Sequence, residues 1–218
     1  MKLQEARKDL YRRLAKEEGF KSRAAYKLIE ANERYRIITR GSRVVDFGAA
    51  PGGWLQVCSR IVGDSGLVVG VDLREISLKG KNLKTLRLDV YDESVGGLVS
   101  KVLGARAADV ILSDLSPSVS GIWELDHFRQ VEMTVRVLSL GETLLKKGGN
   151  GFFKDFEGER SREVRRELIE RFEEVRTMKP RASRNESSEL YYVGLAWRGA
   201  GSAPASLDKS ETASATAP

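Results

Sequence analysis

The sequence predicts an α/β fold whose mostly parallel sheet is covered by helices on both faces. Short apolar runs rich in Val, Ile and Phe alternate along the chain with longer segments of helical periodicity. Such alternation is typical of strands joined by helical crossovers, which make neighbouring strands parallel. With 218 residues, of which 41% are apolar, the chain is long enough to bury a sizeable core in one domain.

The beginning of the chain is predicted to be helical. Good helix formers run through residues 3–35 and are interrupted by Gly19, which predicts two helices rather than one. Ser22 is the candidate N-cap of the second helix, residues 23–35. Lys27 lies among the apolar positions of this second helix, which is an unusual place for a charged side chain.

Strands and helices alternate in the rest of the chain. The expected strands are residues 43–47, 66–71, 85–88, 108–113, 151–154, 173–178 and 189–197. The expected helices are residues 54–62, 93–103, about 125–145, which ends at a Lys-Lys-Gly-Gly run, and 161–172. A loop rather than a helix joins the last two strands, which predicts an antiparallel pair at one edge of the sheet.

The charge is unevenly distributed, and it suggests how the chain is organised. Residues 1–43 hold thirteen lysines and arginines against six acids, whereas the whole chain has a net charge of +6. We therefore expect a basic helical extension over residues 1–40, a nearly neutral body over 41–198 and a tail over 199–218. A basic segment beside a neutral body is typical of polyanion binding, with a solvated helix face as the alternative. The tail is small, polar and aperiodic, as in disordered segments.

The composition excludes several classes of protein. Cys58 is the only cysteine and His127 the only histidine, so neither an intrachain disulfide nor a His-rich metal site can form, and we expect no metal. We expect Cys58 to pack in the core and His127 to lie at the surface. No apolar run is long enough to span a bilayer, and residues 1–8 lack the apolar core of a secretory signal. These features predict a soluble cytoplasmic protein that has no membrane partner.

Acids and glycines follow four of the predicted strands. They are Asp46 with the turn glycines Gly48, Gly52 and Gly53, then Asp72, Asp89 and Asp114. The carboxyl ends of parallel strands meet at one edge of a sheet, where α/β proteins bind their ligands. Glycines allow a ligand to approach the backbone closely, and the Asp72 carboxylate can accept hydrogen bonds from ribose hydroxyls. Turn formation alone is the alternative for each single residue, but four such strand ends together favour a ligand site.

The glycine turn does not suit a phosphate. The G-x-G-x-x-G pattern and the lysine of a P-loop are both absent, and Pro51 removes one amide donor. A nucleoside without phosphate fits better, and S-adenosylmethionine is the common ligand of this kind.

Two lysines have apolar neighbours. Lys154 ends a Gly-Phe-Phe run that is predicted to be a buried strand, and Lys27 lies on an apolar helix face. A half-desolvated lysine can lose its proton near neutral pH and act as a general base. The alternative for either lysine is that the stem is buried and the amine reaches solvent.

Five motifs resemble the FtsJ/RrmJ (RlmE) family of ribose 2′-O-methyltransferases. They are S-R-A-A-Y-K-L (residues 22–28), D-F-G-A-A-P-G-G-W (46–54), S-D-L-S-P (113–117), F-K followed by E-G-E (153–159) and S-E-L-Y (188–191). The resemblance extends from about Arg7 to Trp197. The chain departs from the family pattern at Tyr26, at Asp155 and in its tail.

The resemblance implies a Rossmann-like methyltransferase fold with seven strands, a catalytic domain over residues 41–198 and S-adenosylmethionine as cofactor. The implied catalytic tetrad consists of Lys27, Asp114, Lys154 and Glu189. The implied cofactor site comprises Gly48, Gly52, Gly53 and Trp54 in the first loop, Asp72 for the ribose, Asp89 near the adenine and Asp114 near the methionine moiety.

The expected reaction is 2′-O-methylation of a uridine ribose in large-subunit (23S-type) ribosomal RNA, with the RNA bound within the ribosomal subunit and Lys154 as general base. Lys27 would hold the ribose, Asp114 would orient Lys154, and Glu189 would fix Lys27 or the hydroxyl. Structured RNA would lie across the basic helices, with a second rim at Arg176, Lys179, Arg181 and Arg184. DNA is not an expected substrate because it lacks the 2′-hydroxyl.

Two alternatives stay open. Family members that methylate the tRNA anticodon loop share the N-terminal pattern, but no second domain for tRNA is visible, which favours ribosomal RNA. From another class, the chain could be a non-catalytic RNA-binding ribosome-assembly factor, against which the intact tetrad argues. Trp123 is expected either to contact the substrate or to pack in a lid or core.

Overall fold

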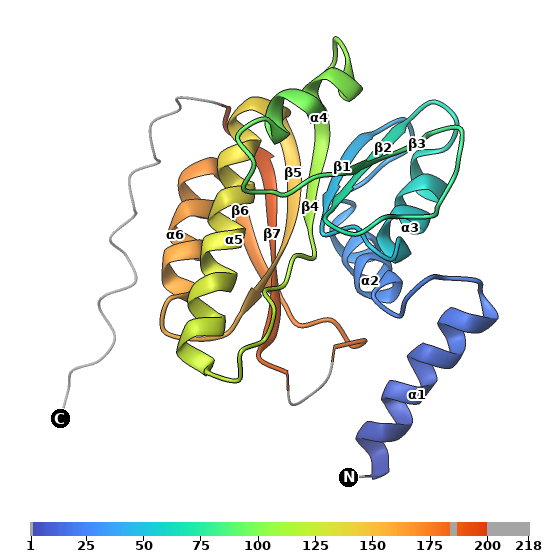
Figure 1. The fold of residues 1–218 in the computed structure, drawn as a ribbon, viewed down its shortest axis with the longest axis vertical. Coiled ribbons are helices and arrows are strands. Elements are labelled where there is room, and N and C mark those ends of the chain that lie inside the picture. The colour runs from blue at the N-terminus through green and yellow to red at the C-terminus, as the bar shows by residue number, and fades with distance from the viewer. Residues whose placement is uncertain (1, 184–186, 200–218) are drawn as a thin grey trace, which may run out of the picture.

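The apolar runs form one seven-stranded sheet in the computed structural model, which describes residues 2–183 and 187–199, with side chains from Leu10 on (Figure 1). The strands are β1 (Arg43–Phe47), β2 (Leu67–Asp72), β3 (Leu83–Arg87), β4 (Ala108–Ser113), β5 (Leu145–Phe156), β6 (Phe172–Met178) and β7 (Glu189–Trp197). The helices are α1 (Lys2–Glu17), α2 (Ala25–Tyr35), α3 (Gly53–Val62), α4 (Val95–Leu103), α5 (Trp123–Leu144) and α6 (Ser161–Arg171). The tail predicted over residues 199–218 lies outside the described residues, apart from Gly199.

The strand order is β3-β2-β1-β4-β5-β7-β6. The pairs β1–β2, β1–β4, β2–β3 and β4–β5 are parallel, whereas β7 runs antiparallel to both β5 and β6. The mostly parallel sheet and the antiparallel pair at its edge, both predicted from the sequence, are confirmed. The reversed strand β7 therefore brings its first residues to the edge where the parallel strands end.

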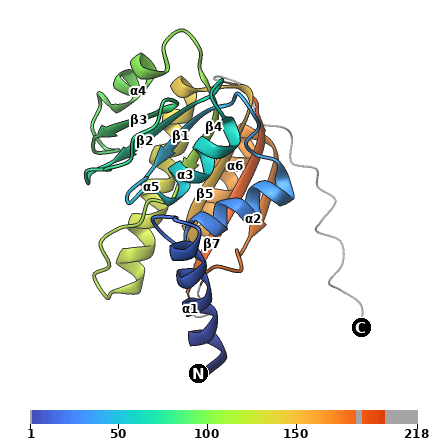
Figure 2. The ribbon, with the colours of Figure 1, turned by 90° about the vertical axis from the view of Figure 1, so that its right-hand side faces the viewer.

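Helices cover both faces of the sheet, and strand side chains alternate between the two cores (Figure 2). On one face α2 and α3 pack against side chains such as Leu112 and Phe152. On the other, α4, α5 and α6 pack against side chains such as Ile111 and Phe153. Because successive strand residues point to opposite faces, every second residue of β5 lies toward α2. Helix α2 is part of this core, since Leu28 is completely buried.

Two local predictions are wrong. The Lys-Lys-Gly-Gly run does not end a helix, because α5 ends at Leu144 and residues 145–149 already belong to β5, where Leu145 pairs with Ala108 of β4. Sheet pairing here outweighs the local preference of the glycines for a helix end. Ser22 does not cap α2, whose N-cap is Ala24 without a side-chain hydrogen bond. Ser22 instead packs against Gly53 at the start of α3, where a side chain on Gly53 would collide with it.

Gly48 joins the ends of β1 and β4. Its φ of +78° is one that residues with a Cβ rarely adopt, and a Cβ there would lie 2.8 Å from the Leu115 amide nitrogen. The close approach that requires this glycine is therefore made by the protein's own backbone. It brings the loop after β1 against Asp114, which directly follows β4.

Candidate active site

Three neighbouring strands and one helix place polar side chains together at the carboxyl edge of the sheet. Asp114 follows β4, Lys154 lies near the end of β5, and Glu189 begins β7. In the antiparallel pairing of β5 with β7, Lys154 lies opposite Tyr191 and Phe156 lies opposite Glu189. Lys154 and Phe156 are two residues apart in β5, as Glu189 and Tyr191 are in β7, so these four side chains lie on one face of the sheet. Helix α2 covers this face, and its first turn carries Lys27.

The predicted tetrad is brought together by ion pairs. The Lys27 Nζ lies 2.6 Å from Glu189 Oε1, and the Lys154 Nζ lies 3.4 Å from Glu189 Oε2. The Lys154 Nζ is also 3.8 Å from Asp114 Oδ1. One carboxylate thus binds both lysines, and Asp114 lies on the other side of Lys154. We call Lys27, Asp114, Lys154, Glu189 and Tyr191 the catalytic cluster, after the role that the family resemblance predicts for all of them except Tyr191.

Tyr191 is the member of the cluster that sequence reasoning did not assign a role. Its hydroxyl accepts a hydrogen bond from Lys27 Nζ at 3.0 Å and donates one to Asp114 Oδ1 at 2.7 Å. Tyr191 therefore links Lys27 to Asp114. The sequence feature that could have indicated a role for Tyr191 is its spacing from Glu189. Two residues apart in a predicted strand, both side chains lie on one face of the sheet.

Burial sets the electrostatics of the cluster. Lys27, Lys154 and Glu189 are only 6%, 9% and 8% exposed, so their charges depend on one another rather than on water. Burial alone would raise the pKa of Glu189, but the charges of Lys27 and Lys154 and its hydrogen bonds outweigh this and lower the pKa overall. Glu189 is therefore ionised at neutral pH. Burial and the neighbouring Asp114 and Glu189 carboxylates raise the pKa of Tyr191 well above its ordinary value, so its hydroxyl keeps its proton.

Neighbouring polar groups hold the cluster in place from outside. The Lys154 carbonyl accepts hydrogen bonds from Gln130 Nε2 at 3.1 Å and Thr134 Oγ1 at 2.9 Å, both on α5. The Ser183 hydroxyl donates to Glu189 Oε1 at 2.7 Å from the segment between β6 and β7. The backbone of β5 and the carboxylate of Glu189 are thereby fixed independently of any ligand.

A cavity of about 700 Å³ opens beside the cluster at the carboxyl ends of β1, β2 and β4. Four of the predicted cofactor residues line it, namely Gly48, Asp72, Asp89 and Asp114. The remaining wall is largely apolar, with side chains such as Tyr91 and Met133. A flat ligand with polar hydroxyls at one end suits such a wall.

The other predicted residues of the glycine loop do not line this cavity. Gly52 packs against the side chain of Leu78, and Gly53 packs against Ser22. The Trp54 side chain is buried, donates a hydrogen bond from Nε1 to the Ala24 carbonyl at 2.7 Å and stacks on Phe152. Trp54 thus ties α2 to α3, and a cofactor contact of these three residues stays a prediction.

Three acidic side chains lie near one another at this end of the sheet, and two of them, Asp72 and Asp114, line the cavity. Asp46 is fully buried, and neither of its oxygens has a hydrogen-bond partner among the described residues. Burial and the nearby carboxylates of Asp114 and Asp72 raise the pKa of Asp46 well above its ordinary value. Asp72 accepts hydrogen bonds from the Ala50 and Arg74 amides at 2.8 Å each. Asp72 and Asp114 in the cavity wall favour a ligand that carries positive charge.

The described part of the chain has neither a metal-binding group of side chains nor a helix that could span a membrane. No group of three or more His, Cys, Asp and Glu side chains is arranged to hold a metal ion there. None of the helices there combines the length and the apolar character that crossing a membrane requires.

Comparison with known proteins gives the family. The family model of the FtsJ-like methyltransferases matches residues 20–197. The chain belongs to the FtsJ-like methyltransferase family. The match confirms the resemblance seen in the motifs, and it includes α2 with Lys27 as well as the whole sheet.

This FtsJ-like methyltransferase spans nearly the whole length of two of its relatives. The chain is 45% identical to "Ribosomal RNA large subunit methyltransferase E" of Cenarchaeum symbiosum over 89% of its own length and 98% of the relative's. It is 44% identical to the protein of the same name in Nitrosopumilus maritimus, over 91% and 100% of the two chains. Among solved structures, a protein of Plasmodium falciparum described as a ribosomal RNA methyltransferase superposes with a TM-score of 0.73 at 25% identity, over 83% of this chain and 100% of that one.

The structure corrects one further prediction and confirms another. Cys58 is buried in the core, as predicted. His127 is buried as well, so its predicted surface position is wrong. Gly158 explains the difference, because it has no side chain to fill the space where the imidazole packs.

Asp155 lies behind the catalytic cluster, on the opposite face of β5 from Lys154, and is completely buried. Burial raises its pKa to about 7, and the Phe156 amide and the Ser161 hydroxyl oppose this only in part. The folded protein therefore keeps a proton on Asp155 between about pH 4 and 7 that the unfolded chain has already released.

The free energy of unfolding is expected to fall as the pH rises through this range, because the folded state binds more protons there than the unfolded state. Asp155→Asn removes the ionisation, so the free energy of unfolding of the variant should not fall in this way. As the pH rises from 4 to 8, the variant should gain roughly 2–4 kcal/mol of stability relative to the native protein. Urea unfolding at pH 5, 6, 7 and 8 measures the difference.

Asp64→Asn is the matched control, because Asp64 is exposed and its substitution should not change the pH dependence. A parallel pH dependence of Asp155→Asn and the native protein would contradict this reading of Asp155.

Proposed function

We propose that the chain transfers a methyl group from S-adenosylmethionine to the 2′-hydroxyl of a uridine in large-subunit ribosomal RNA. The observation that carries the proposal is the buried pair of lysines that share Glu189 beside a cavity with acidic walls. Two relatives named as large-subunit methyltransferases, which the chain matches over nearly their whole length, support ribosomal RNA as the substrate. A cytoplasmic location agrees with this substrate.

The residues around the cavity fit S-adenosylmethionine. This cofactor has no phosphate and carries positive charge on its sulfonium and amino groups, which suits the carboxyl group of Asp114 in the cavity wall. Asp72 would accept hydrogen bonds from the ribose hydroxyls, and Asp89 would lie near the adenine. When bound, the cofactor supplies a methyl group on a sulfonium that is itself the leaving group.

The protein's own part in the reaction is to orient the 2′-hydroxyl and to remove one proton. We assign the proton to the Nζ of Lys154, which lies 3.8 Å from Oδ1 of Asp114, a residue of the cavity wall. The ionised Glu189 fixes both lysines, so Lys27 is positioned to hold the ribose. Tyr191 fixes the positions of Asp114 and Lys27 relative to each other through its two hydrogen bonds. Positioning of this kind accounts for much of the rate of a group transfer to a weak nucleophile.

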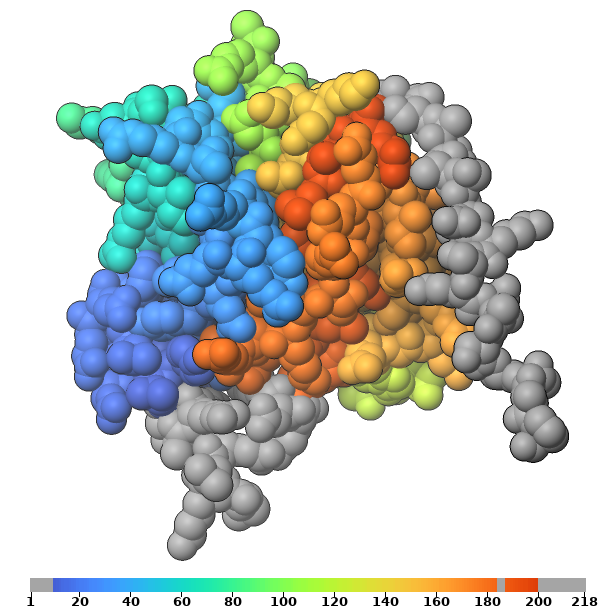
Figure 3. Space-filling model, turned by 180° about the vertical axis from the view of Figure 1, so that it is seen from behind, coloured from blue at the N-terminus to red at the C-terminus, as the bar shows by residue number. Residues whose placement is uncertain are grey.

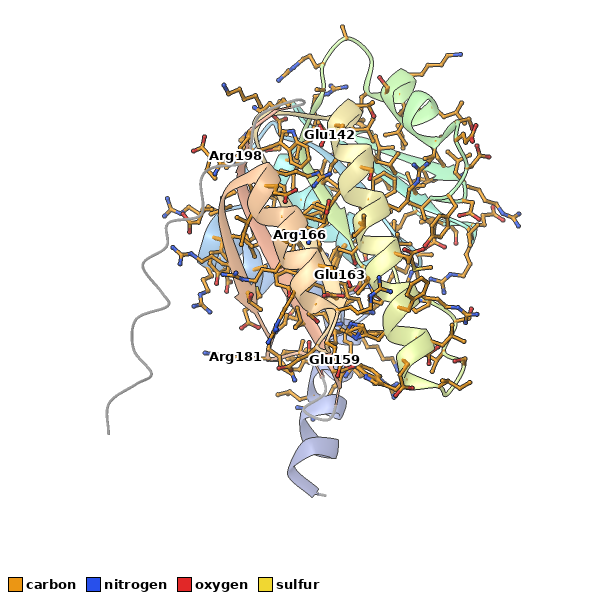
Figure 4. All side chains as sticks on the ribbon, turned by 90° about the vertical axis from the view of Figure 1, so that its left-hand side faces the viewer. Glu142, Glu159, Glu163, Arg166, Arg181 and Arg198 are labelled. Atoms are coloured by element: carbon orange, nitrogen blue, oxygen red, sulfur yellow. The ribbon has the colours of Figure 1, made fainter. Side chains whose placement is uncertain are left out.

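Basic side chains extend from the active-site end and are suited to RNA phosphates. Figure 4 shows Glu159 and Arg181 at one end of the molecule, toward α1, and Glu142 and Arg198 at the other. Seen from behind, the segment between β6 and β7 touches the N-terminal helices (Figure 3), where the Arg181 amide donates to Glu30 at 2.8 Å. The exposed cations of α1, of the segment after it and of the segment after β6 are Arg12, Arg13, Lys16, Lys21, Lys179 and Arg181, of which Arg13 is paired with Glu17. Arg176 is exposed but paired with Glu174, and Arg184 lies outside the described residues.

Lys154→Met is expected to lower the turnover number at least ~10²-fold, because the reaction loses its proton acceptor. The affinity for S-adenosylmethionine should stay within about twofold, since Lys154 does not line the cavity. Steady-state methyl transfer and calorimetric titration of the cofactor measure the two quantities.

Lys101→Met is the control, because Lys101 is exposed on α4 and should not affect either quantity. Retention of most of the turnover by Lys154→Met would exclude Lys154 as the general base.

The substrate is tested with labelled S-adenosylmethionine, large ribosomal subunits and bulk tRNA in parallel, followed by mapping of any 2′-O-methyl group. We expect label on a uridine of the large-subunit RNA alone. Label on tRNA alone would overturn the ribosomal substrate and place the chain with the anticodon-loop enzymes. Cofactor binding without label on either RNA would support the assembly-factor alternative.

A further inference from the structure

Large apolar side chains exposed to solvent gather beside the catalytic cluster. Eight such residues occur in the described part of the chain, and four of them lie within one short stretch, namely Val119, Ile122, Trp123 and Phe128. Trp123 is 44% exposed, whereas Trp54 and Trp197 are 3% and 1% exposed. An exposed group of this kind beside an active site is typical of a surface that binds a ligand.

Ring contacts join Trp123 to the catalytic lysine. The rings of Trp123 and Phe156 stack with their centroids 6.0 Å apart and an angle of 30° between their planes. The Lys154 Nζ lies 5.7 Å from the centroid of the same Phe156 ring. A ribose whose 2′-hydroxyl reaches Lys154 has its base one sugar ring away, which is within the range of Phe156 and Trp123.

The loop before Trp123 is held in place without a ligand. Both the amide and the hydroxyl of Ser120 donate to Asp126 at 2.8 Å, and the Gly121 amide donates to the same carboxylate at 3.2 Å. His127 packs edge-on against Trp123, with ring centroids 5.6 Å apart. Because the aromatic surface is formed in advance, little conformational entropy is lost when a ligand binds it.

We propose that Trp123 and Phe156 form a stacking platform for a nucleobase of the RNA, either the base of the methylated nucleotide or its immediate neighbour. The platform depends on the RNA substrate that the proposed function assigns. RNA-binding proteins recognise unpaired bases by stacking them on aromatic rings, and such stacking tolerates any base because every base has a π-face.

The surroundings of the platform favour RNA over an apolar protein partner. Arg129 is exposed next to Phe128, and Arg160 lies over the Phe128 ring with its guanidinium carbon 4.4 Å from the centroid while it pairs with Glu163. Cations beside aromatic rings are the combination that binds single-stranded nucleic acid. The platform also continues directly into the site that has to admit a ribose.

Tryptophan fluorescence tests stacking without any need for catalysis. The chain has three tryptophans, and only Trp123 is exposed. Titration with a ten-nucleotide oligouridylate is expected to quench the Trp123 emission, and Trp123→Phe should abolish the quenching. Inorganic polyphosphate of equal charge should not quench, because it has no base. Equal quenching by polyphosphate, or none by oligouridylate, would overturn the proposal.

Kinetics with large-subunit ribosomal RNA test the same platform in the reaction. Trp123→Leu keeps an apolar side chain against His127 but cannot stack, so its KM for RNA is expected to rise about tenfold or more. Trp123→Phe keeps a ring and should stay within about threefold of the native KM. Leu98→Ala is the control, because Leu98 is equally exposed on α4 away from the site and should leave KM unchanged. Thermal unfolding of each variant checks that the fold is retained.

The outcomes separate the platform from the proposed function. Quenching by oligouridylate without methyl transfer to any RNA would support the platform while the proposed substrate failed. Methyl transfer with a native KM in Trp123→Leu would support the function and exclude the platform. Binding of a protein at this surface with no effect of Trp123 on RNA would likewise exclude it.

Discussion

The ion pairs of Glu189 with Lys27 and Lys154 are the interaction on which the rest of the active site depends. The two lysines come from α2 and β5, which are far apart in the sequence, and Glu189 is the group that both contact. Its position at the start of β7 follows from the reversed direction of that strand, because the other strand ends at this edge are carboxyl ends. The antiparallel strand β7 therefore brings the Glu189 carboxylate to Lys27 of α2 and Lys154 of β5.

Such a cluster is costly for stability. Removing one partner of a buried ion pair typically destabilises a protein by about 3–5 kcal/mol, because the other charge is left without compensation. Here every charged member has at least one partner, and Tyr191 supplies a hydrogen bond where Lys27 and Asp114 do not meet directly. An apolar core would be simpler to fold, so the cluster is best understood as a functional arrangement that the surrounding sheet supports.

Much of the fold followed from the sequence. The alternation of strands and helices predicted the sheet, and residues 43–47, 108–113 and 189–197 agree with the observed strands to the residue. The prediction failed where tertiary contacts outweigh local preference. Pairing with β4 turns the Lys-Lys-Gly-Gly run into strand, and contact with α3 takes Ser22 away from its capping position.

Site residues that belong to a recognisable motif could be predicted from the sequence. Residues whose role depends only on packing in three dimensions could not. The two lysines and two acids of the tetrad were predicted from motifs. The contacts of Tyr191 depend on distances across the cluster that the spacing of residues in the sequence does not give. His127 was misplaced because the space left by Gly158 is visible only in three dimensions. For Trp123 the sequence left contact with the substrate and packing open. The structure shows that the ring packs on His127 and is 44% exposed, so packing is observed and contact with the substrate stays a prediction.

The central claim is that the catalytic cluster acts as one unit, and a double-mutant cycle tests it most directly. Single-turnover methyl transfer to large-subunit ribosomal RNA would be measured for Lys27→Met, Glu189→Gln and the double variant. If the two residues act through their mutual contact, the double variant should be about as slow as the slower single variant. Losses that multiply in the double variant would show that Lys27 and Glu189 act independently, and would contradict the account.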